Sequence, residues 1–293
     1  MTATRKWSAP TSEYLVPFDG SFRIAEAPTT PPGKVDKDAA EAARQQDTAE
    51  IGQLQRKLYA DNRYAALFLF QAMDAGGKDS TIRNVFTGVN PAGFQVSSFK
   101  APSDEELDHD FLWRVAAQLP ERGRIGVFNR SHYEEVLVVR VHPELLGGQR
   151  LPNPNLETLW SERYESIRNF EKHIAENGTL IVKFFLNVSL EEQKDRLLQR
   201  IDKPSRNWKF NPGDVKERER WPDYMRAFED ALNETSRPWA PWYAIPADSK
   251  PYMRLEVARI VRETLQSLGL GYPRIDEAAR LALLECREAL ERS

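Results

Sequence analysis

A carboxylate, a glycine pair and a lysine stand close together in this sequence, at Asp74, Gly76, Gly77 and Lys78. They follow a short apolar run at residues 67–70, which is typical of a buried parallel strand, and they precede a segment with helical spacing. Backbone N–H groups in the first turn of a helix have no helical acceptor, and the helix dipole favours negative charge there. A lysine beside them adds a mobile charge that can follow a transferring phosphoryl group. The stretch therefore predicts a phosphate-binding loop.

This loop departs from the common pattern G-x-x-x-x-G-K-[ST]. Ala72 stands where the first glycine is expected and Asp79 where the hydroxyl is expected, with hydroxyls at Ser80 and Thr81 instead. A carboxylate inside a phosphate site is repelled unless a cation lies between them, so we interpret Asp74 as a Mg²⁺ ligand or as a group that orients the acceptor. An ordinary glycine-containing turn is the alternative. The residues predicted to bind phosphate here are Ala75, Gly76, Gly77, Lys78, Asp79, Ser80 and Arg83.

A second polar group follows the apolar run at residues 125–128, which we predict to be another strand. In phosphate-loop proteins the strand beside the loop often carries a metal-binding acid at its C-terminal end. Here that place holds Asn129, which can ligate a cation or donate a hydrogen bond but brings no charge. Arg130 beside it can bind phosphate oxygens through both arms of its guanidinium. For His132, close by, a structural role is the simpler interpretation.

A basic and aromatic stretch, residues 194–210, follows the fourth predicted strand. Arg196, Arg200 and Lys203 are spaced i, i+4 and i+7 and would share one face of a helix. Such a row could line a channel for a long anion or bind a triphosphate, and a solvated charged face is the alternative. Its position after the fourth strand is where kinases with a phosphate loop carry their lid.

We expect this lid module to span about residues 200–240. It would continue through a turn at residues 211–213, a charged run that looks solvated, and a helix at residues 221–232. The tryptophans expected to pack the lid are Trp208, Trp221, Trp239 and Trp242.

The bulk properties exclude several classes of protein. The 293-residue chain has 41% hydrophobic and 29% charged residues, as soluble globular proteins do, and its net charge is −3. Without a global basic field, nucleic acid is not an expected partner, and any polyanion site must be local. No apolar run approaches the ~20 residues that span a membrane, so no membrane contact is expected. The single cysteine, Cys286, suits a reducing cytoplasm.

Strands alternate with helices along the chain, which predicts an α/β fold with a parallel sheet covered on both faces. Residues 1–35 are expected to form an irregular arm, ordered by side chains such as Tyr14 and Phe18, and residues 36–293 the domain. The other predicted elements are strands at 94–99, 180–188 and 243–246, and helices at 36–59, 109–119, 155–176, 249–268 and 274–290. Ser189 and Glu192 are expected to form a capping box, and Ser249 an N-cap.

Four blocks of sequence together resemble one family. They are QAMDAGGKDSTIRNV at 71–85, GVFNRSHYEEVLVVRVHPE at 126–144, DKPSRNWKF at 202–210 and PWYAIPADSKPYMR at 241–254. In this order, over about residues 35–270, they resemble the family-2 polyphosphate kinases. The Asn-Arg-Ser form at residues 129–131, followed by Glu134 and Glu135, resembles the branch that phosphorylates both AMP and ADP. In other branches the residue that matches Asn129 is Asp.

The resemblance implies a three-layer α/β/α P-loop kinase with a helical lid, which transfers phosphoryl groups reversibly from inorganic polyphosphate to AMP and ADP, giving ADP and ATP. It implies Mg²⁺, with Mn²⁺ as a substitute, held by Asp74 and Asn129. It assigns catalysis to Asp74, Lys78 and Arg130, and nucleotide binding to Asn129, Arg130 and Glu134. The polyphosphate channel would be lined by Arg200, Lys203, Arg206 and Lys209. Aromatic residues in the arm and the C-terminal helix favour a homo-oligomer.

Two other functions stay open at this point. One is a nucleoside or nucleotide kinase that uses ATP as donor, for which a basic channel long enough for a polymer would be surplus. The other is a non-catalytic module that binds polyanions, against which the presence of both Asp74 and Lys78 argues.

Overall fold

A five-stranded sheet forms the centre of the computed structural model, which describes residues 7–293. The strands are β1 (Ala65–Gln71), β2 (Phe94–Ser98), β3 (Ile125–Asn129), β4 (Thr179–Asn187) and β5 (Trp242–Pro246). Their order is β2-β3-β1-β4-β5, and every neighbouring pair is parallel. All of β1 and nearly all of β4 are buried, as expected of strands covered on both faces. The predicted parallel α/β fold is confirmed.

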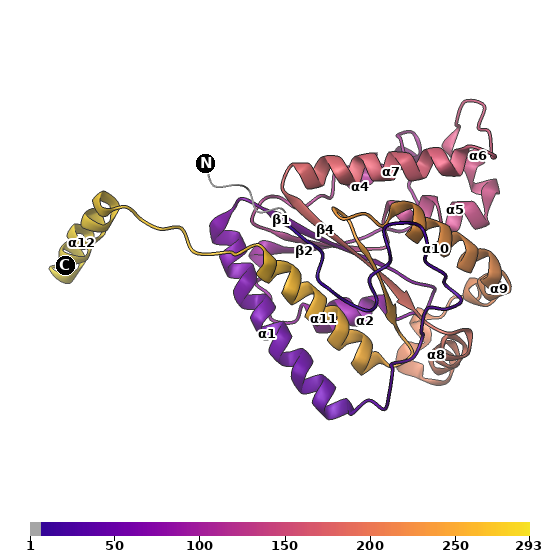
Figure 1. Ribbon diagram of the computed structural model, residues 1–293, viewed down its shortest axis with the longest axis horizontal. Helices are drawn as coiled ribbons and strands as arrows, with labels where there is room; N and C mark the ends of the chain where they lie inside the picture. Colours follow the sequence, from indigo (N-terminus) through magenta and orange to yellow (C-terminus); the bar gives the residue numbers. More distant parts are fainter. Residues whose placement is uncertain (1–6) are drawn as a thin grey trace.

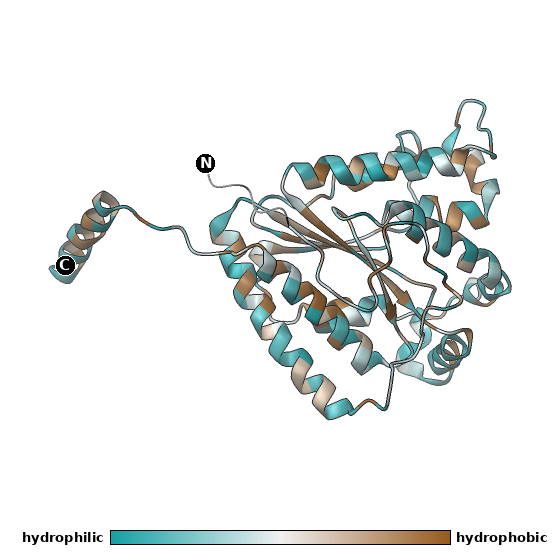
Figure 2. Cartoon of the chain, viewed as in Figure 1, coloured by the Kyte–Doolittle hydropathy of each residue, from teal (hydrophilic) through white to brown (hydrophobic). Residues whose placement is uncertain are grey.

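Helices cover both faces of this sheet (Figure 1). On one face, α11 (Lys250–Ser267) lies between α1 (Lys37–Asp61) and α2 (Lys78–Val85). On the other face, α7 (Leu159–Glu176) packs on β4 and against α10 (Trp221–Thr235). Figure 2 shows teal and brown residues alternating along the helices, and the buried apolar cluster joins residues of the strands to residues of the covering helices, so the apolar core lies between the layers. The three-layer prediction is confirmed.

Shorter elements connect these layers. The short α-helices are α3 (Asp104–Leu107), α4 (Trp113–Ala116), α5 (Val138–Val141), α6 (Leu146–Gln149), α8 (Leu190–Asp202) and α9 (Gly213–Glu219). The 3₁₀ turns are η1 (Pro91–Gly93), η2 (His132–Glu135), η3 (Pro143–Leu145) and η4 (Pro204–Lys209). The predicted lid, about residues 200–240, contains the end of α8, η4, α9 and α10, and its role as a lid stays a prediction.

Three local predictions were wrong. The helix expected at 109–119 is only the single turn α4, because the Asp110 side chain accepts from the Leu112 N–H and forms a local turn instead. Helix α7 begins at Leu159, since Asn155 closes a turn by accepting from the Glu157 N–H. At α8, Ser189 caps the Glu192 N–H but the reciprocal bond is missing.

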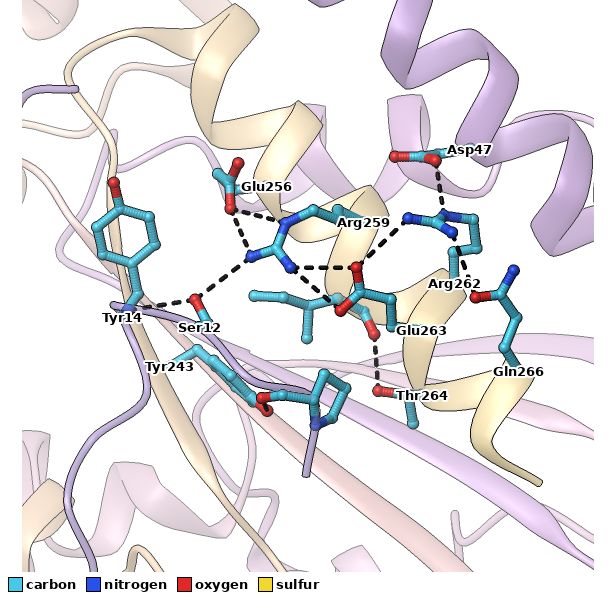
Figure 3. Close-up of polar contacts among 12 residues, drawn as sticks. Ser12, Tyr14, Asp47, Tyr243, Glu256, Arg259, Arg262, Glu263, Thr264 and Gln266 are labelled. Carbon is cyan, nitrogen blue, oxygen red and sulfur yellow. Dashed lines mark hydrogen bonds and ion pairs between the residues drawn. The ribbon is translucent and has the colours of Figure 1, made fainter. Parts of the chain in front are cut away.

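Residues 7–36 contain no helix and pair with the sheet only at one isolated bridge, as expected of an arm; residues 1–6 lie outside the described part. Val16 N–H donates to the Trp242 carbonyl and the Ala244 N–H to Tyr14, so the arm lies antiparallel along the edge of β5. Figure 3 shows that Ser12 also receives a hydrogen bond from Arg259 of α11. The arm is therefore attached to both the sheet and its covering helix. Its status as a unit separate from the domain stays a prediction.

The last helix, α12 (Glu277–Glu291), stands away from the rest of the protein (Figure 1). None of its residues is buried, and Leu283 and Leu290 are exposed. Within residues 7–293, no helix has both the length and the apolar character to cross a bilayer.

Candidate active site

The phosphate loop connects the C-terminal end of β1 to α2 with backbone conformations that explain its glycines. Gly77 is the N-cap of α2 with φ +106°, a left-handed conformation that side chains rarely adopt. A Cβ on Gly76 would lie 2.6 Å from the Ala72 Cβ and 2.8 Å from the Met73 carbonyl oxygen. Ala75 also has a positive φ, +60°. The loop therefore curls tightly, and the first-turn N–H groups of α2 have no helical acceptor.

Lys78, the first residue of α2, turns its side chain back over this loop. Its Nζ donates to the Ala72 carbonyl at 2.7 Å and, more weakly, to Met73 at 3.4 Å. Burial and the nearby Arg130 charge, partly offset by Asp74, lower the pKa of Lys78 to about 8. A phosphate in the loop would replace these carbonyl contacts with a stronger charge-assisted one.

Arg130 connects the end of β3 to the loop. Its Nη2 lies 2.8 Å from Asp74 Oδ1, and its Nη1 lies 3.4 Å from Glu134 Oε2. The backbone of Arg130 is left-handed, with φ +64°, and its N–H donates to Phe70 of β1, which fixes the direction of the side chain. Burial raises the pKa of Glu134, and Arg130 and Lys78 oppose that rise. The three residues predicted to be catalytic thus lie together.

Asn129, the last residue of β3, faces the first turn of α2. Its Nδ2 donates to Asp79 Oδ1 at 2.8 Å. The amide oxygen of Asn129 and the second carboxylate oxygen of Asp74 have no hydrogen-bond donor among the described residues, and both side chains line the cleft described next.

A cleft of about 810 Å³ opens above the phosphate loop at the C-terminal edge of the sheet. Its cationic side chains outnumber its acids, Asp74, Asp79 and Asp214. The cations come from the loop, α2, the ends of β2 and β3, the lid and α11; they are Lys78, Arg83, Lys100, Arg130, Arg196, Arg200, Arg206, Lys209, Lys250 and Arg254. Every residue predicted to bind phosphate in the loop lines this cleft.

The lid residues divide into two groups. Arg200, Arg206 and Lys209 line the cleft, whereas Lys203 does not. Helix α8 ends at Asp202, and Lys203 has extended backbone angles, so the predicted single helix face is interrupted before Lys203. Arg196 is buried and donates to backbone carbonyls, so it does not share the surface role of Arg200.

One ion pair lies within the lid, and a second joins the lid to the first turn of α2. Arg200 lies 3.0 Å from Asp214 of α9, and Lys209 Nζ lies 3.8 Å from Asp79. Trp208 was predicted to pack the lid, which is wrong: it is 78% exposed and lines the cleft, with the Lys209 ammonium 4.9 Å from the centre of its ring.

Sequence reasoning missed the cations Lys100, Lys250 and Arg254 and the acid Asp214. Lys250 and Arg254 were in view inside one of the four characteristic blocks. They follow β5, and ligands of parallel α/β sheets bind beyond the C-terminal ends of the strands, so their position was a usable signal. Lys100 and Asp214 lie in segments without a regular pattern, and no comparable signal marks them.

His132 does not line the cleft, as expected of a structural residue. It is buried, with Nε2 3.5 Å from Glu171, and burial lowers its pKa although Glu171 opposes that shift.

A parallel sheet with a glycine-rich phosphate loop after β1, a basic cleft at its C-terminal edge and a helical lid defines a kinase of the P-loop type. Residues 34–269 match the family described as Polyphosphate kinase 2 (PPK2). The chain belongs to this family, and it is an enzyme that transfers phosphoryl groups.

Several proteins of this family are similar to this chain over most of its length. An ADP-polyphosphate phosphotransferase of Rhodopseudomonas palustris is 55% identical over 242 residues, 82% of this chain and 84% of the relative. An AMP/ADP-polyphosphate phosphotransferase of Meiothermus ruber is 43% identical over 275 residues, 93% of this chain and 99% of the relative. The crystal structure of polyphosphate kinase 2 from Arthrobacter aurescens TC1 superposes with a TM-score of 0.85 at 38% identity, covering 97% of this chain and 99% of that one.

Proposed function

We propose that this enzyme transfers the terminal phosphoryl group of inorganic polyphosphate to AMP and ADP, giving ADP and ATP, and that the transfer is reversible. The observation that carries the proposal is the distribution of cations in the cleft, which come from both sides of the phosphate loop and from the lid. A linear polyanion needs charge along its whole length. An ATP donor would need cations only around three phosphates and an apolar pocket for its base.

The transfer depends on charge stabilisation rather than on acid–base chemistry. The acceptor phosphate of AMP or ADP is already ionised, so it needs little help from a base. Lys78 and Arg130 would offset the charge that builds on the transferring group. Asp74, bonded to Arg130, would keep the guanidinium aimed at that group.

The cleft fits a divalent cation. Asp74 and Asn129 each present an oxygen that has no donor in the described part of the chain, and oxygen ligands suit Mg²⁺, with Mn²⁺ as a substitute. Within residues 7–293 no three His, Cys, Asp or Glu side chains gather as a metal site, so phosphate and water would supply most ligands. When bound, the ion would neutralise charge on the phosphate oxygens.

The acceptor range separates the two named relatives, one named for ADP and the other for AMP and ADP. We favour both acceptors, because the Asn129-Arg130-Ser131 sequence resembles the branch that uses both. Asn129 brings no negative charge to the site, unlike the Asp that matches it in other branches.

The test is to incubate the purified protein with Mg²⁺, long-chain polyphosphate and either AMP or ADP, without ATP, and to separate the nucleotides by chromatography. The proposal predicts ADP followed by ATP from AMP. ATP from ADP with no product from AMP would retain the polyphosphate donor and refute the wider acceptor range. Product only when ATP replaces polyphosphate would identify an ordinary nucleotide kinase.

We further propose a cytoplasmic homo-oligomer. The nucleotide substrates support the location, and the exposed leucines of α12 support a subunit contact. Light scattering of the purified chain would test the assembly, and a mass of one chain would refute it.

A further inference from the structure

Helix α8 binds three consecutive carbonyl groups of the phosphate loop. Gln193 Nε2 donates to the Asp74 carbonyl at 2.9 Å. Arg196 Nη1 donates to the Ala75 carbonyl at 3.2 Å and to the Gly76 carbonyl at 3.0 Å. Gln193 and Arg196 are 1% and 4% exposed, so water does not compete for these contacts.

These bonds determine where the loop's N–H groups point. A trans peptide is planar, and its C=O and following N–H point in opposite directions. Carbonyls held on the α8 side therefore turn the N–H groups of Ala75, Gly76 and Gly77 away from α8. The Gly76 N–H closes the turn onto Met73, whereas the Gly77 N–H has no acceptor among residues 7–293 and is left for an anion.

Arg196 has no donor to spare for substrate. Besides the two loop carbonyls, its Nη2 donates to the Ala247 carbonyl after β5 and, more weakly, to the Asp248 carbonyl at 3.4 Å, and its Nε lies 2.7 Å from Glu192, so all five N–H groups have partners. The Glu192 carboxylate thus neutralises the charge of Arg196, and the two arms of the Arg196 guanidinium join the loop to the end of β5. This guanidinium is part of the support of the loop and not a phosphate ligand.

Gln193 also connects the loop to the lid. Its Oε1 accepts from Arg218 Nη1 of α9 at 2.6 Å, while its Nε2 donates to Asp74. Arg218 can only donate and a carbonyl can only accept, so one orientation of this amide satisfies both partners. The same Arg218 donates to the Leu190 carbonyl at the start of α8. A displacement of α9 would therefore break a bond to the group that holds Asp74.

We propose that Gln193 and Arg196 are positioning residues that hold the phosphate loop in its anion-binding conformation, and that Arg218 couples lid position to the loop through Gln193. The kinetic part of this proposal rests on the proposed polyphosphate-dependent activity. The binding part does not, because it concerns only the affinity of the loop for a phosphate chain.

The kinetic test uses Gln193→Met, Arg218→Met and the double variant. A loop misplaced by a fraction of an ångström loses transition-state stabilisation, so Gln193→Met should lower kcat by about 10- to 100-fold with KM for ADP within about threefold. Arg218→Met should cost less, and the double variant should be no slower than Gln193→Met. Lys194→Met, which removes an exposed lysine from the same helix, is the matched control and should stay within about twofold of the wild type.

The binding test measures the affinity for tripolyphosphate by calorimetry without nucleotide, for the wild type, Gln193→Met, Arg196→Lys and Lys194→Met. We expect Gln193→Met and Arg196→Lys to bind tripolyphosphate at least about tenfold more weakly than the wild type, and Lys194→Met to bind it as the wild type does. If the wild type binds tripolyphosphate but transfers no phosphoryl group from long-chain polyphosphate, the proposed function fails and this measurement still decides the positioning role. Wild-type affinity and kcat in Gln193→Met would overturn the positioning role. Additive losses in the double variant would overturn the coupling to the lid.

Discussion

The guanidinium of Arg130 lies 2.8 Å from the carboxylate of Asp74, which joins the end of β3 to the middle of the phosphate loop. Both side chains are partly exposed to the cleft, so a phosphate group can reach them. A phosphate that binds Arg130 must share its fork with Asp74 and Glu134. The ion pair therefore holds the Arg130 guanidinium in place before substrate binds.

Replacing Arg130 by lysine tests this geometry. Arg130→Lys keeps the charge but loses the fork that reaches Asp74 and phosphate together, so turnover should fall by about 100-fold, more than KM rises. Arg226→Lys, which alters an exposed arginine of α10, is the control and should behave as the wild type. Near-normal turnover of Arg130→Lys would show that a point charge is sufficient.

The Lys78 ammonium should give the enzyme an alkaline limit. Because its pKa is lowered to about 8, the free enzyme loses this positive charge as pH rises through 8, and kcat/KM should fall there. Bound polyphosphate favours the ammonium, so the fall in kcat should lie at higher pH. A pH profile of both constants measures this. Identical alkaline limits for kcat and kcat/KM would contradict the assignment.

The lid cations should act on the polymer and not on the chemical step. The double change Arg206→Ala and Lys209→Ala should raise KM for polyphosphate about tenfold with kcat within about threefold, and should reduce the salt dependence of KM. Lys203→Ala removes a lid lysine outside the cleft and is the control. An equal effect of Lys203→Ala would mean that general charge, rather than the cleft, attracts the polymer.

The buried ion pair Lys183–Glu171 should be critical for stability. Its atoms lie 2.5 Å apart, and the two side chains are 0% and 1% exposed. Lys183→Met leaves the Glu171 charge buried without its partner, and should lower the free energy of unfolding by about 3–5 kcal/mol. Adding Glu171→Leu removes that charge and should recover much of the loss. Urea unfolding measures both, and a loss under about 1 kcal/mol for the single variant would contradict the burial argument.

The sheet and the loop could be predicted because their signals are local. The buried strands β1 and β4 are continuous apolar runs, and glycine, lysine and a following helix define the loop at Gly76–Lys78 without any distant contact. The contact between Asp74 and Arg130 could also be predicted in principle, because the ends of neighbouring parallel strands meet at one edge of the sheet.

The supporting contacts could not be predicted in this way. Arg196 looked like a surface cation because its spacing matches Arg200, and only the fold shows that it points at the carbonyls of Ala75 and Gly76. Lys100 reaches the cleft from a segment without periodicity. The expected helix at 109–119 failed because one side-chain bond from Asp110 outweighs a weak helical pattern.

The central claim is that polyphosphate itself donates the phosphoryl group in this cleft. The most direct measurement follows ³²P from uniformly labelled polyphosphate into ATP formed from unlabelled ADP, with Mg²⁺ and no added ATP, by the wild type and by Lys78→Met. We predict ATP labelled only at its γ-phosphate with the wild type, and at least about 100-fold slower labelling with Lys78→Met. Unlabelled ATP accompanied by an equal amount of AMP would show that two ADP molecules exchange a phosphoryl group, and it would contradict the account.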